Sequence, residues 1–239
     1  MIFQKLFQLT TSELYQHICE ELVKYDYTKI TKDTSFIAAK GNIPIVLAVH
    51  MDTVFDEKSR GRMMIFYDEK CRVFWSPMGL GADDRAGVAM ILTLLDETSL
   101  RPHLLFTTDE ESKGDGAYQV AMRKEELFGN NIKYVIQLDR QGYKECVFYQ
   151  CPNKAFEKYI NTFGFITNYG TYTDISVICP EWNIAGVNLS VGYYYEHSYI
   201  EHFYLDSWIY TYKRVVEMLE NPPTTQWKYG KKQFLKEKK

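Results

Sequence analysis

Short apolar runs that alternate with segments of helical pattern constrain the fold of this chain most strongly. The runs PIVLAVH (44–50), HLLFTT (103–108) and KYVIQL (133–138) are nearly continuous in apolar residues, which is typical of strands buried on both faces of a sheet. Helical patterns separate them. Strands that alternate with helices of this length predict an α/β fold, in which a mixed, mostly parallel central sheet lies between two layers of helices.

The remaining elements follow from shorter patterns. Residues 11–25 have the apolar spacing of an amphipathic helix, and Thr10 with Glu13 could form a capping box at its start. The segments 63–67 and 72–75 predict a β-hairpin, because turn-forming residues separate two extended runs. We expect further helices at about 86–97, 116–128 (capped by Asp115), 153–163 and 202–221, and further strands at 34–39, 146–150 and 185–192.

Length and composition indicate one globular domain. The 239 residues are 46% apolar and 25% charged, an ordinary balance for a chain that builds a single large core. We therefore expect one domain over residues 1–224 and a basic tail over residues 225–239. The formal net charge of −3 indicates neither a nucleic-acid nor a membrane partner, because either would favour a basic surface.

The sequence contains no evident targeting segment. No apolar run approaches the roughly 18 residues that span a bilayer, and the opening MIFQKLFQLT lacks the apolar core of a signal peptide. The five cysteines include no CxxC pair, so that neither a disulfide framework nor a thiolate zinc site is indicated. We expect reduced thiols and, by default, a cytoplasmic protein, although an upstream signal could have been removed.

Polar side chains gather where the predicted strands end, which is where α/β sheets place their active sites. His50 and Asp52 end the first strand. Residues two apart on a strand point to the same side, so Asp52 could orient the imidazole of His50. Asp109, Glu110 and Glu111 follow the second strand, and a cation would relieve the repulsion among these carboxylates. A solvated acidic loop is the plainer interpretation of the triplet.

Three further positions complete the set. A glycine-rich loop at 79–87 places Asp83 and Asp84 before a helix, where one of them could simply cap it. Asp139 ends the third strand and His197 follows a run of tyrosines. Taken singly, these are more often a turn residue and a packed histidine. Together, in this order and each at a strand end, the positions indicate a metal site.

Five short motifs carry a resemblance to a known group of enzymes. They are VHMDT (49–53), GADDRAG (81–87), TDEE (108–111), LD (138–139) and EH (196–197). In this combination they resemble the co-catalytic zinc exopeptidases, the clan of the M20, M28 and M42 metallopeptidases, over about residues 44–202.

Two details refine this resemblance. The segment TDIS (173–176) is similar to the Ser-Asp step before a helix in M28 and M42 members, although a helix cap explains it equally well. The interval between Asp139 and His197 is too short for the lid and dimerisation domain that M20 enzymes usually insert there. The layout is therefore closer to M28, and a substrate contact from such a lid is not expected.

The resemblance implies a site for two divalent metal ions. The expected protein ligands are His50, Asp83, Glu111, Asp139 and His197. Of these, Asp83 would bridge the ions, His50 and Asp139 would complete the set of one ion, and Glu111 and His197 would complete the other. The ligand set suits zinc, which we expect, and also cobalt or manganese.

Two neighbouring carboxylates have catalytic roles in the same comparison. Glu110 would be the general base that takes a proton from the attacking water and gives it to the leaving amine. Asp52 would support His50 from behind. One tyrosine of the run 193–195 could help to stabilise the oxyanion, although packing is the commoner role for each. The peptide bond after Asp83 is often cis in these enzymes.

We expect a peptide-bond hydrolase, either an aminopeptidase or another exopeptidase that acts on small peptides. An N-acyl amino acid deacylase of the same chemistry is the alternative, and Arg85 or Arg140 could then bind the substrate carboxylate. A catalytically inactive relative that still binds metal is a third interpretation, against which the presence of Glu110 argues. The sequence leaves the substrate and the oligomeric state open.

Overall fold

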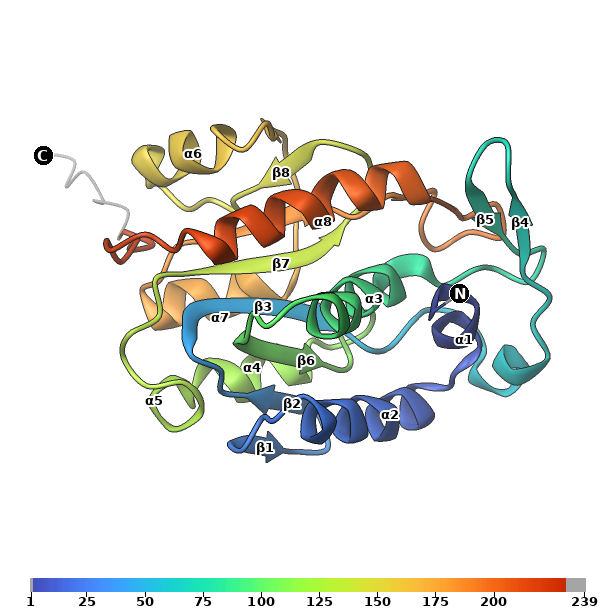
Figure 1. Cartoon of the computed structure of the whole chain (residues 1–239), viewed down its shortest axis with the longest axis horizontal. Coiled ribbons are helices and arrows are strands. Elements are labelled where there is room, and N and C mark those ends of the chain that lie inside the picture. The colour runs from blue at the N-terminus through green and yellow to red at the C-terminus, as the bar shows by residue number, and fades with distance from the viewer. Residues whose placement is uncertain (1, 231–239) are drawn as a thin grey trace, which may run out of the picture.

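A mixed eight-stranded sheet forms the centre of the molecule, and a smaller four-stranded sheet lies at one end of it (Figure 1). The computed structural model describes residues 2–230. The helices are α1 (Ile2–Gln8), α2 (Thr11–Lys24), the 3-10 helix η1 (Glu57–Arg62), α3 (Ala82–Glu97), α4 (Asp115–Ala121), α5 (Lys124–Leu127), α6 (Lys154–Asn161), α7 (Asp174–Trp182) and α8 (Leu205–Glu220). The strands are β1 (Ile30–Lys32), β2 (Phe36–Ala39), β3 (Ile43–His50), β4 (Phe66–Asp68), β5 (Val73–Trp75), β6 (Pro102–Thr107), β7 (Tyr134–Arg140), β8 (Glu145–Val147), β9 (Ile166–Thr167), β10 (Gly186–Ser190), β11 (Tyr193–Tyr194) and β12 (His202–Tyr204).

Four parallel strands, in the order β6-β3-β7-β10, form the middle of the large sheet. On one side β2 pairs antiparallel with β6, and β1 pairs antiparallel with β2. On the other side β8 pairs antiparallel with β10 and parallel with β9. The small sheet, in the order β11-β12-β5-β4, is antiparallel throughout. The predicted α/β fold with a mixed, mostly parallel sheet is confirmed.

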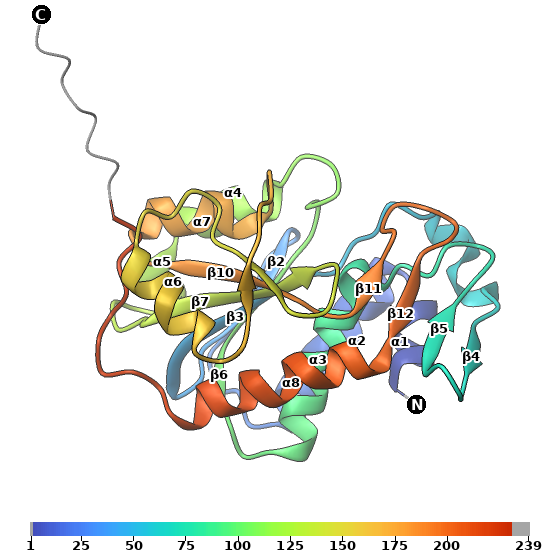
Figure 2. The ribbon, with the colours of Figure 1, turned by 90° about the horizontal axis from the view of Figure 1, so that it is seen from above.

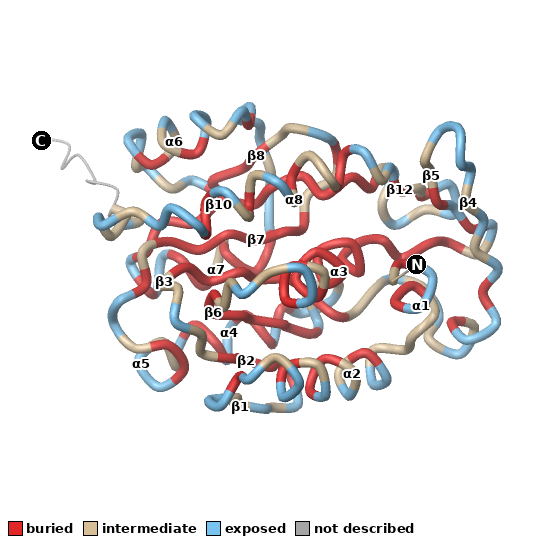
Figure 3. The backbone as a smooth tube through the Cα atoms, in the orientation of Figure 1, coloured by how far each residue is buried: buried red, intermediate tan, exposed pale blue. Residues whose placement is uncertain are grey.

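Alternate residues of the central strands face two different helical layers. On β3, Val46 and Ala48 belong to the core beneath α4, α5 and α7, whereas Leu47 and Val49 belong to the core shared with α1, α2, α3 and α8. Figure 2 shows the layers from the side, with α4 and α7 on one face of the sheet and α3 and α8 on the other. Because both faces are covered, the central strands are buried along most of their length (red in Figure 3). Their continuous apolar runs follow from this burial.

Two local predictions are confirmed in detail. The side chain of Thr10 accepts a hydrogen bond from the backbone of Glu13, and the Glu13 carboxylate accepts one from the backbone of Thr10. These bonds form the expected capping box of α2. The strands β4 and β5 pair as the expected hairpin, with Phe66 opposite Trp75.

The helix predicted at 116–128 was wrong in its extent and in its cap. The helix expected at 116–128 is divided into α4 and α5, because Arg123 leaves the helical conformation and forms ion pairs with Asp33 and Glu126. Asp115 does not cap α4: Gly114, in the left-handed conformation that glycine tolerates best, occupies the N-cap position.

The other two boundary differences lie next to the candidate site. The helix α3 begins at Ala82 rather than near residue 86, and its first turn contains non-helical backbone angles at Asp83 and Asp84. Residues 202–204 form β12 instead of the first turn of α8, because they pair with β5. Sequence patterns do not register such a tertiary pairing.

The two ends of the described chain pack onto the domain. The first helix, α1, was not expected from the sequence, and it places Phe3, Leu6 and Phe7 in the core. Within the predicted tail at 225–239, the described part reaches residue 230, and Trp227 pairs with the backbone of Lys133 and packs on aromatic residues of α6. Residues 231–239 lie outside the described residues, so the division into a domain and a tail stays a prediction. Within residues 2–230, no helix is long and apolar enough to cross a membrane.

The buried His103 predicts a pH dependence of stability. Its ring stacks on Phe128, its Nδ1 accepts a hydrogen bond from the backbone of Gly41, and burial lowers its pKa to about 4. The folded pKa lies below the unfolded value of about 6.5, so the unfolded chain binds more protons between these values. This contribution, about 3 kcal/mol, is therefore fully present above pH 6.5 and is lost as the pH falls toward 4.

Urea unfolding of metal-free protein at pH 7 and pH 4.5 measures this contribution. His103→Gln retains an acceptor for Gly41 and cannot titrate, so its free energy of unfolding is expected to fall less than that of the wild type over this range. Equal losses in the two proteins would show that His103 is not the titrating group.

Candidate metal centre

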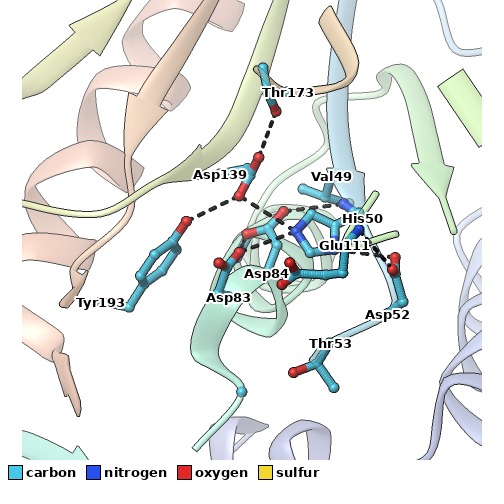
Figure 4. A network of polar contacts seen from close by, with 12 residues as sticks. Val49, His50, Asp52, Thr53, Asp83, Asp84, Glu111, Asp139, Thr173 and Tyr193 are labelled. Atoms are coloured by element: carbon cyan, nitrogen blue, oxygen red, sulfur yellow. Dashed lines mark hydrogen bonds and ion pairs between the residues drawn. The ribbon is translucent and has the colours of Figure 1, made fainter. Parts of the chain in front are cut away.

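The five predicted ligands converge at the carboxyl ends of the parallel strands, although they come from distant parts of the chain. His50 ends β3, Asp139 lies near the end of β7 and Glu111 follows β6. Asp83 lies in the first turn of α3, and His197 follows β11 of the small sheet. Figure 4 shows the group around His50, with Asp83, Asp139 and Glu111 directed toward the imidazole.

Asp83 stands between two imidazoles. Its Oδ1 lies 3.1 Å from His50 Nε2, and its Oδ2 lies 3.2 Å from His197 Nε2. A second carboxylate approaches each imidazole: Asp139 Oδ1 lies 3.5 Å from His50 Nε2, and Glu111 Oε2 lies 2.8 Å from His197 Nε2. The five side chains therefore form two half-sites that share one aspartate.

The spacing of these atoms fits divalent metal ions. Ligands at the zinc distances of about 2.0–2.1 Å, arranged as a tetrahedron, lie roughly 3.3 Å from one another, and the four contacts measure 2.8–3.5 Å. Ligand atoms of two overlapping sets also come within 4.8 Å of each other, namely His50 with Asp84 and Asp139, and His50 with Asp83 and Glu111. Imidazole and carboxylate donors together suit zinc and neighbouring transition metals.

Asp52 links the two half-sites. Its Oδ1 lies 3.3 Å from His50 Nδ1, an ion-pair distance, although neither atom has a hydrogen-bond partner of good geometry among the described residues. Its Oδ2 accepts a hydrogen bond from the backbone of Glu111 at 3.1 Å. A carboxylate behind a histidine fixes the orientation of the ring, so Asp52 lies where the sequence placed it.

Asp139 is held from three sides. Its Oδ1 accepts a hydrogen bond from the hydroxyl of Tyr193 at 3.0 Å, and its Oδ2 accepts one from Thr173 at 2.8 Å (Figure 4). Its Oδ2 also accepts from Gln137 at 3.0 Å. The amide of Asn188 bonds to its backbone. Of the tyrosine run, only Tyr193 reaches this cluster among the described contacts, and it does so as a donor to Asp139.

The adjacent aspartates of the glycine-rich loop have different roles. The peptide bond between Asp83 and Asp84 is cis, as the resemblance implied. Asp84 is fully buried, and its two oxygens accept hydrogen bonds from the backbone of His50 and of Gly87. Asp83 is thus free to face the imidazoles, while Asp84 ties the loop to β3. Gly87 is needed here because a Cβ would lie 2.2 Å from the carbonyl of Leu138.

The charges of the cluster are strongly coupled. Burial opposes the charge on His50, but the adjacent carboxylates of Asp139, Asp52 and Asp83 raise its pKa well above its ordinary value. Hydrogen bonds to Asp83 and Glu111 raise the pKa of His197 to about 11. Protons on the imidazoles thus balance the carboxylates, and this is the positive charge that a metal ion would supply in their place.

Glu110 faces a small cavity beside the two half-sites. Asp83, Asp139 and His197 line the same cavity. Burial, and the neighbouring carboxylates to a lesser degree, raise the pKa of Glu110 to about 9. Asp109, the first residue of the acidic triplet, is exposed and does not line this cavity. The triplet thus divides into a solvated residue, a carboxylate that faces the cavity and a predicted ligand.

The two arginines considered for carboxylate binding lie in different places. Arg85 is fully buried and donates hydrogen bonds to the carbonyls of Leu6 and Leu9. The suggestion that it binds substrate is therefore wrong, because it fastens α1 to α3 and is not accessible. Arg140 lines the cavity next to Asp139.

Sequence reasoning missed Glu201, which lies beneath the glycine-rich loop. Its carboxylate is 1% exposed and accepts hydrogen bonds from the backbone of Gly81 at 2.6 Å and of Asp83 at 3.0 Å. Arg60, also buried, packs against the same loop and donates to the carbonyl of Leu80. No motif predicts this contact, because Glu201 and Asp83 are far apart in the sequence. Asp174, part of the TDIS segment, is also buried and bonds to Thr107.

Replacing Glu201 by alanine is expected to release the loop that carries Asp83. Two buried backbone N–H groups lose their acceptor, which costs about 1–3 kcal/mol for each unsatisfied group, and zinc affinity falls because Asp83 is no longer held. Glu201→Gln keeps one acceptor oxygen and is expected to lose less. Urea unfolding and zinc titration test this, with the exposed Glu217→Ala as control. Unchanged zinc affinity in Glu201→Ala would contradict a role in positioning Asp83.

Comparison with known proteins gives structural relatives only. No protein-family model matches the sequence, and no curated protein matches it by sequence. Three similar solved structures are a tripeptidase from Staphylococcus aureus (TM-score 0.70, 14% identity), the aminopeptidase PepT from Bacillus cereus (0.68, 16%) and a TET aminopeptidase from a marine sediment archaeon of the Thaumarchaeota (0.67, 12%). The alignments cover 91%, 91% and 92% of this chain, respectively, and 96% of each relative. At such identities the likeness establishes the shared fold, which is the fold that the resemblance implied.

Proposed function

We propose that this chain is a dinuclear-metal hydrolase that cleaves the amide bond of small peptides as an exopeptidase, most simply as an aminopeptidase. One observation carries the proposal: the two carboxylate oxygens of Asp83 face two different imidazoles, and each imidazole has a further carboxylate beside it. A single metal ion would not need an aspartate placed between two such half-sites. The pattern suits a pair of ions that share one bridging ligand.

The assignment of ligands follows the two half-sites. His50 and Asp139 would hold one ion, Glu111 and His197 would hold the other, and Asp83 would serve both. We propose zinc, because two imidazoles and three carboxylates form a donor set that zinc accepts readily. When bound, such ions polarise the scissile carbonyl and lower the pKa of an attacking water.

The protein side chains supply the proton transfers and the orientation. Glu110 lies in the cavity with Asp83 and His197. Two cations held beside it would offset the burial and the carboxylates that raise its pKa, and the ionised carboxylate could then accept a proton from water and return it to the leaving amine. Asp52 holds the ring of His50, and Tyr193 and Thr173 hold the carboxylate of Asp139. His50 is 1% exposed whereas the side chain of His197 is 52% exposed, so substrate would approach from the half-site of His197.

The structural relatives favour peptide-bond hydrolysis over other reactions of such a site. They are described as a tripeptidase and as aminopeptidases. An N-acyl amino acid deacylase is the second candidate, favoured by the position of Arg140 in the cavity. We also propose a cytoplasmic location, since Cys19, Cys71, Cys146, Cys151 and Cys179 are all free thiols, which suits a reducing compartment.

Hydrolysis assays on zinc-loaded protein test the function. Unblocked di- and tripeptides, the same peptides with an acetylated N-terminus and N-acetyl amino acids are supplied separately, and free amino acids are quantified. We expect release of amino acids from short peptides, loss of this activity with a chelator and recovery with zinc. Failure to cleave any of these substrates at full zinc occupancy would contradict the proposed hydrolase.

A further inference from the structure

The cavity beside the candidate metal centre is small. Its volume is about 190 Å³, below the roughly 300–1,000 Å³ typical of pockets for drug-sized ligands. Its walls include Tyr149, Thr171 and Tyr172 as well as Asp83 and Glu110. A peptide bound at the metal centre therefore finds room here for about one residue. The group at the carboxyl end of that residue then lies against the cavity wall.

Arg140 is the arginine of this wall. It ends β7 directly after Asp139 and is partly buried. Among residues 2–230 its guanidinium forms no hydrogen bond and no ion pair of 4 Å or less, and its Nε atom is buried without an acceptor. The fully buried Arg60 and Arg85 also have an Nε without an acceptor, but each of them donates to backbone carbonyls through a terminal nitrogen, which Arg140 does not.

The guanidinium of Arg140 therefore lacks a hydrogen-bond acceptor within the protein. A partly buried guanidinium loses hydration, and the loss is offset only when hydrogen-bond acceptors replace the water. The acidic groups of the cavity do not supply an acceptor. Asp139 accepts from Tyr193, Thr173 and Gln137. Glu196 accepts from Gln141 through Oε1, and its Oε2 has no hydrogen-bond partner among the described residues, so neither of its oxygens bonds to Arg140. A carboxylate is the partner that the planar guanidinium binds best, through two parallel hydrogen bonds.

We propose that Arg140 binds the free carboxylate of the substrate, and that the preferred substrates carry this carboxylate on the residue directly after the scissile amide. This inference rests on the proposed hydrolase function. Dipeptides and N-acyl amino acids share the required chemistry. A longer peptide places a neutral amide at the same point and loses the charge-assisted hydrogen bonds, so Arg140 selects for short substrates.

Three substrates that differ in one group test this selection on the zinc-loaded protein. Alanyl-alanine carries both the amine and the carboxylate, alanyl-alaninamide lacks the carboxylate, and N-acetylalanine lacks the amine. Wild-type protein is expected to prefer alanyl-alanine over its amide by about 10²-fold in kcat/KM, the size expected for hydrogen bonds to a charged group. Hydrolysis of N-acetylalanine at a similar rate would identify the acyl amino acid as the source of the carboxylate, and its resistance would identify the dipeptide.

Substitution of Arg140 assigns the preference to this side chain. Arg140→Met is expected to bring the ratio of acid to amide hydrolysis close to one, by slowing the acid while leaving the amide nearly unchanged. Arg140→Lys keeps the charge without the planar pair of donors and is expected to retain part of the ratio. Arg62→Met removes an equally positive but exposed side chain outside the cavity and should keep the full ratio.

A binding measurement keeps this test separate from catalysis. Calorimetry on the zinc-loaded Glu110→Gln protein compares alanyl-alanine with alanyl-alaninamide without turnover, and the acid should bind about 10- to 100-fold more tightly. Equal affinity for both, or a preference that survives in a variant that also carries Arg140→Met, would overturn the role of Arg140. Preferential binding of the acid without hydrolysis in the wild type would instead overturn the proposed function alone.

Discussion

Replacing Glu110 by glutamine is expected to reduce kcat for peptide hydrolysis by about 10³-fold, within the range of 10²- to 10⁴-fold typical of a general base. Glutamine has nearly the same shape but cannot accept a proton. Glu110 faces the cavity shared by Asp83, Asp139 and His197, and neither half-site requires it as a ligand. Zinc content should therefore stay at the wild-type level while turnover is lost.

Two readouts separate catalysis from folding in this experiment. Elemental analysis measures zinc per chain, and initial rates on a dipeptide measure kcat and KM. Glu125→Gln, the same change at an exposed glutamate of α5, is the matched control and should behave as wild type. Normal turnover by Glu110→Gln would mean that another group accepts the proton.

Replacing Asp83 by alanine is expected to have the second large effect, because it removes a ligand from both half-sites at once. Both His50 and His197 lose the carboxylate that faces them, and each half-site keeps only two protein ligands. We expect bound zinc to fall to one ion or none per chain and activity to fall on the order of 10⁴-fold, since both the activated water and the polarised carbonyl depend on the ions.

Zinc titration followed by calorimetry gives the number of ions and their affinities in this variant. Asp109→Asn, at an exposed aspartate of the acidic triplet whose left-handed backbone asparagine tolerates, serves as control and should bind zinc as the wild type does. Retention of two tightly bound ions by Asp83→Ala would exclude a bridging role for Asp83.

The central fold could be predicted from the sequence because its strands carry their own signal. Each of β3, β6 and β7 is buried on both faces, and such burial requires a continuous apolar run that is visible without any structure. The capping box of Thr10 and Glu13 is equally local, since both partners lie within one helical turn. The positions of His50, Glu111 and Asp139 followed from the same strands, because a strand that ends in a histidine or a carboxylate presents it at the carboxyl edge of the sheet. Asp83, His197 and the division of the ligands between two ions came from the resemblance to known enzymes.

The features that escaped prediction depend on contacts between distant segments. The division between α4 and α5 arises where Arg123 pairs with Asp33, far away in the sequence. The support of Asp83 by Glu201 comes from the small sheet, whose last strands are too short for a clear pattern. The carboxylate of Glu201 becomes significant only because folding buries it under the glycine-rich loop.

The choice between Arg85 and Arg140 as the residue that binds a carboxylate also depended on contacts between distant segments. Arg85 and Arg140 each follow an aspartate of the site in the sequence, and the sequence did not indicate which of them would bind a carboxylate. In the fold, Arg85 turns away from the site to hold the carbonyls of Leu6 and Leu9 in α1 and its end. Arg140 remains at the cavity. The difference depends on α1, a helix that the sequence did not predict.

Counting the metal ions in the wild-type protein tests the two-metal centre most directly. The protein is purified without chelator, equilibrated with zinc, freed of unbound metal and measured by elemental analysis against its concentration, with a chelator-treated sample as the blank. Two tightly held ions per chain are the predicted result, as expected for half-sites that share Asp83. A chain that holds no zinc, or only one ion at saturation, would contradict the dinuclear centre and with it the proposed mechanism of peptide hydrolysis.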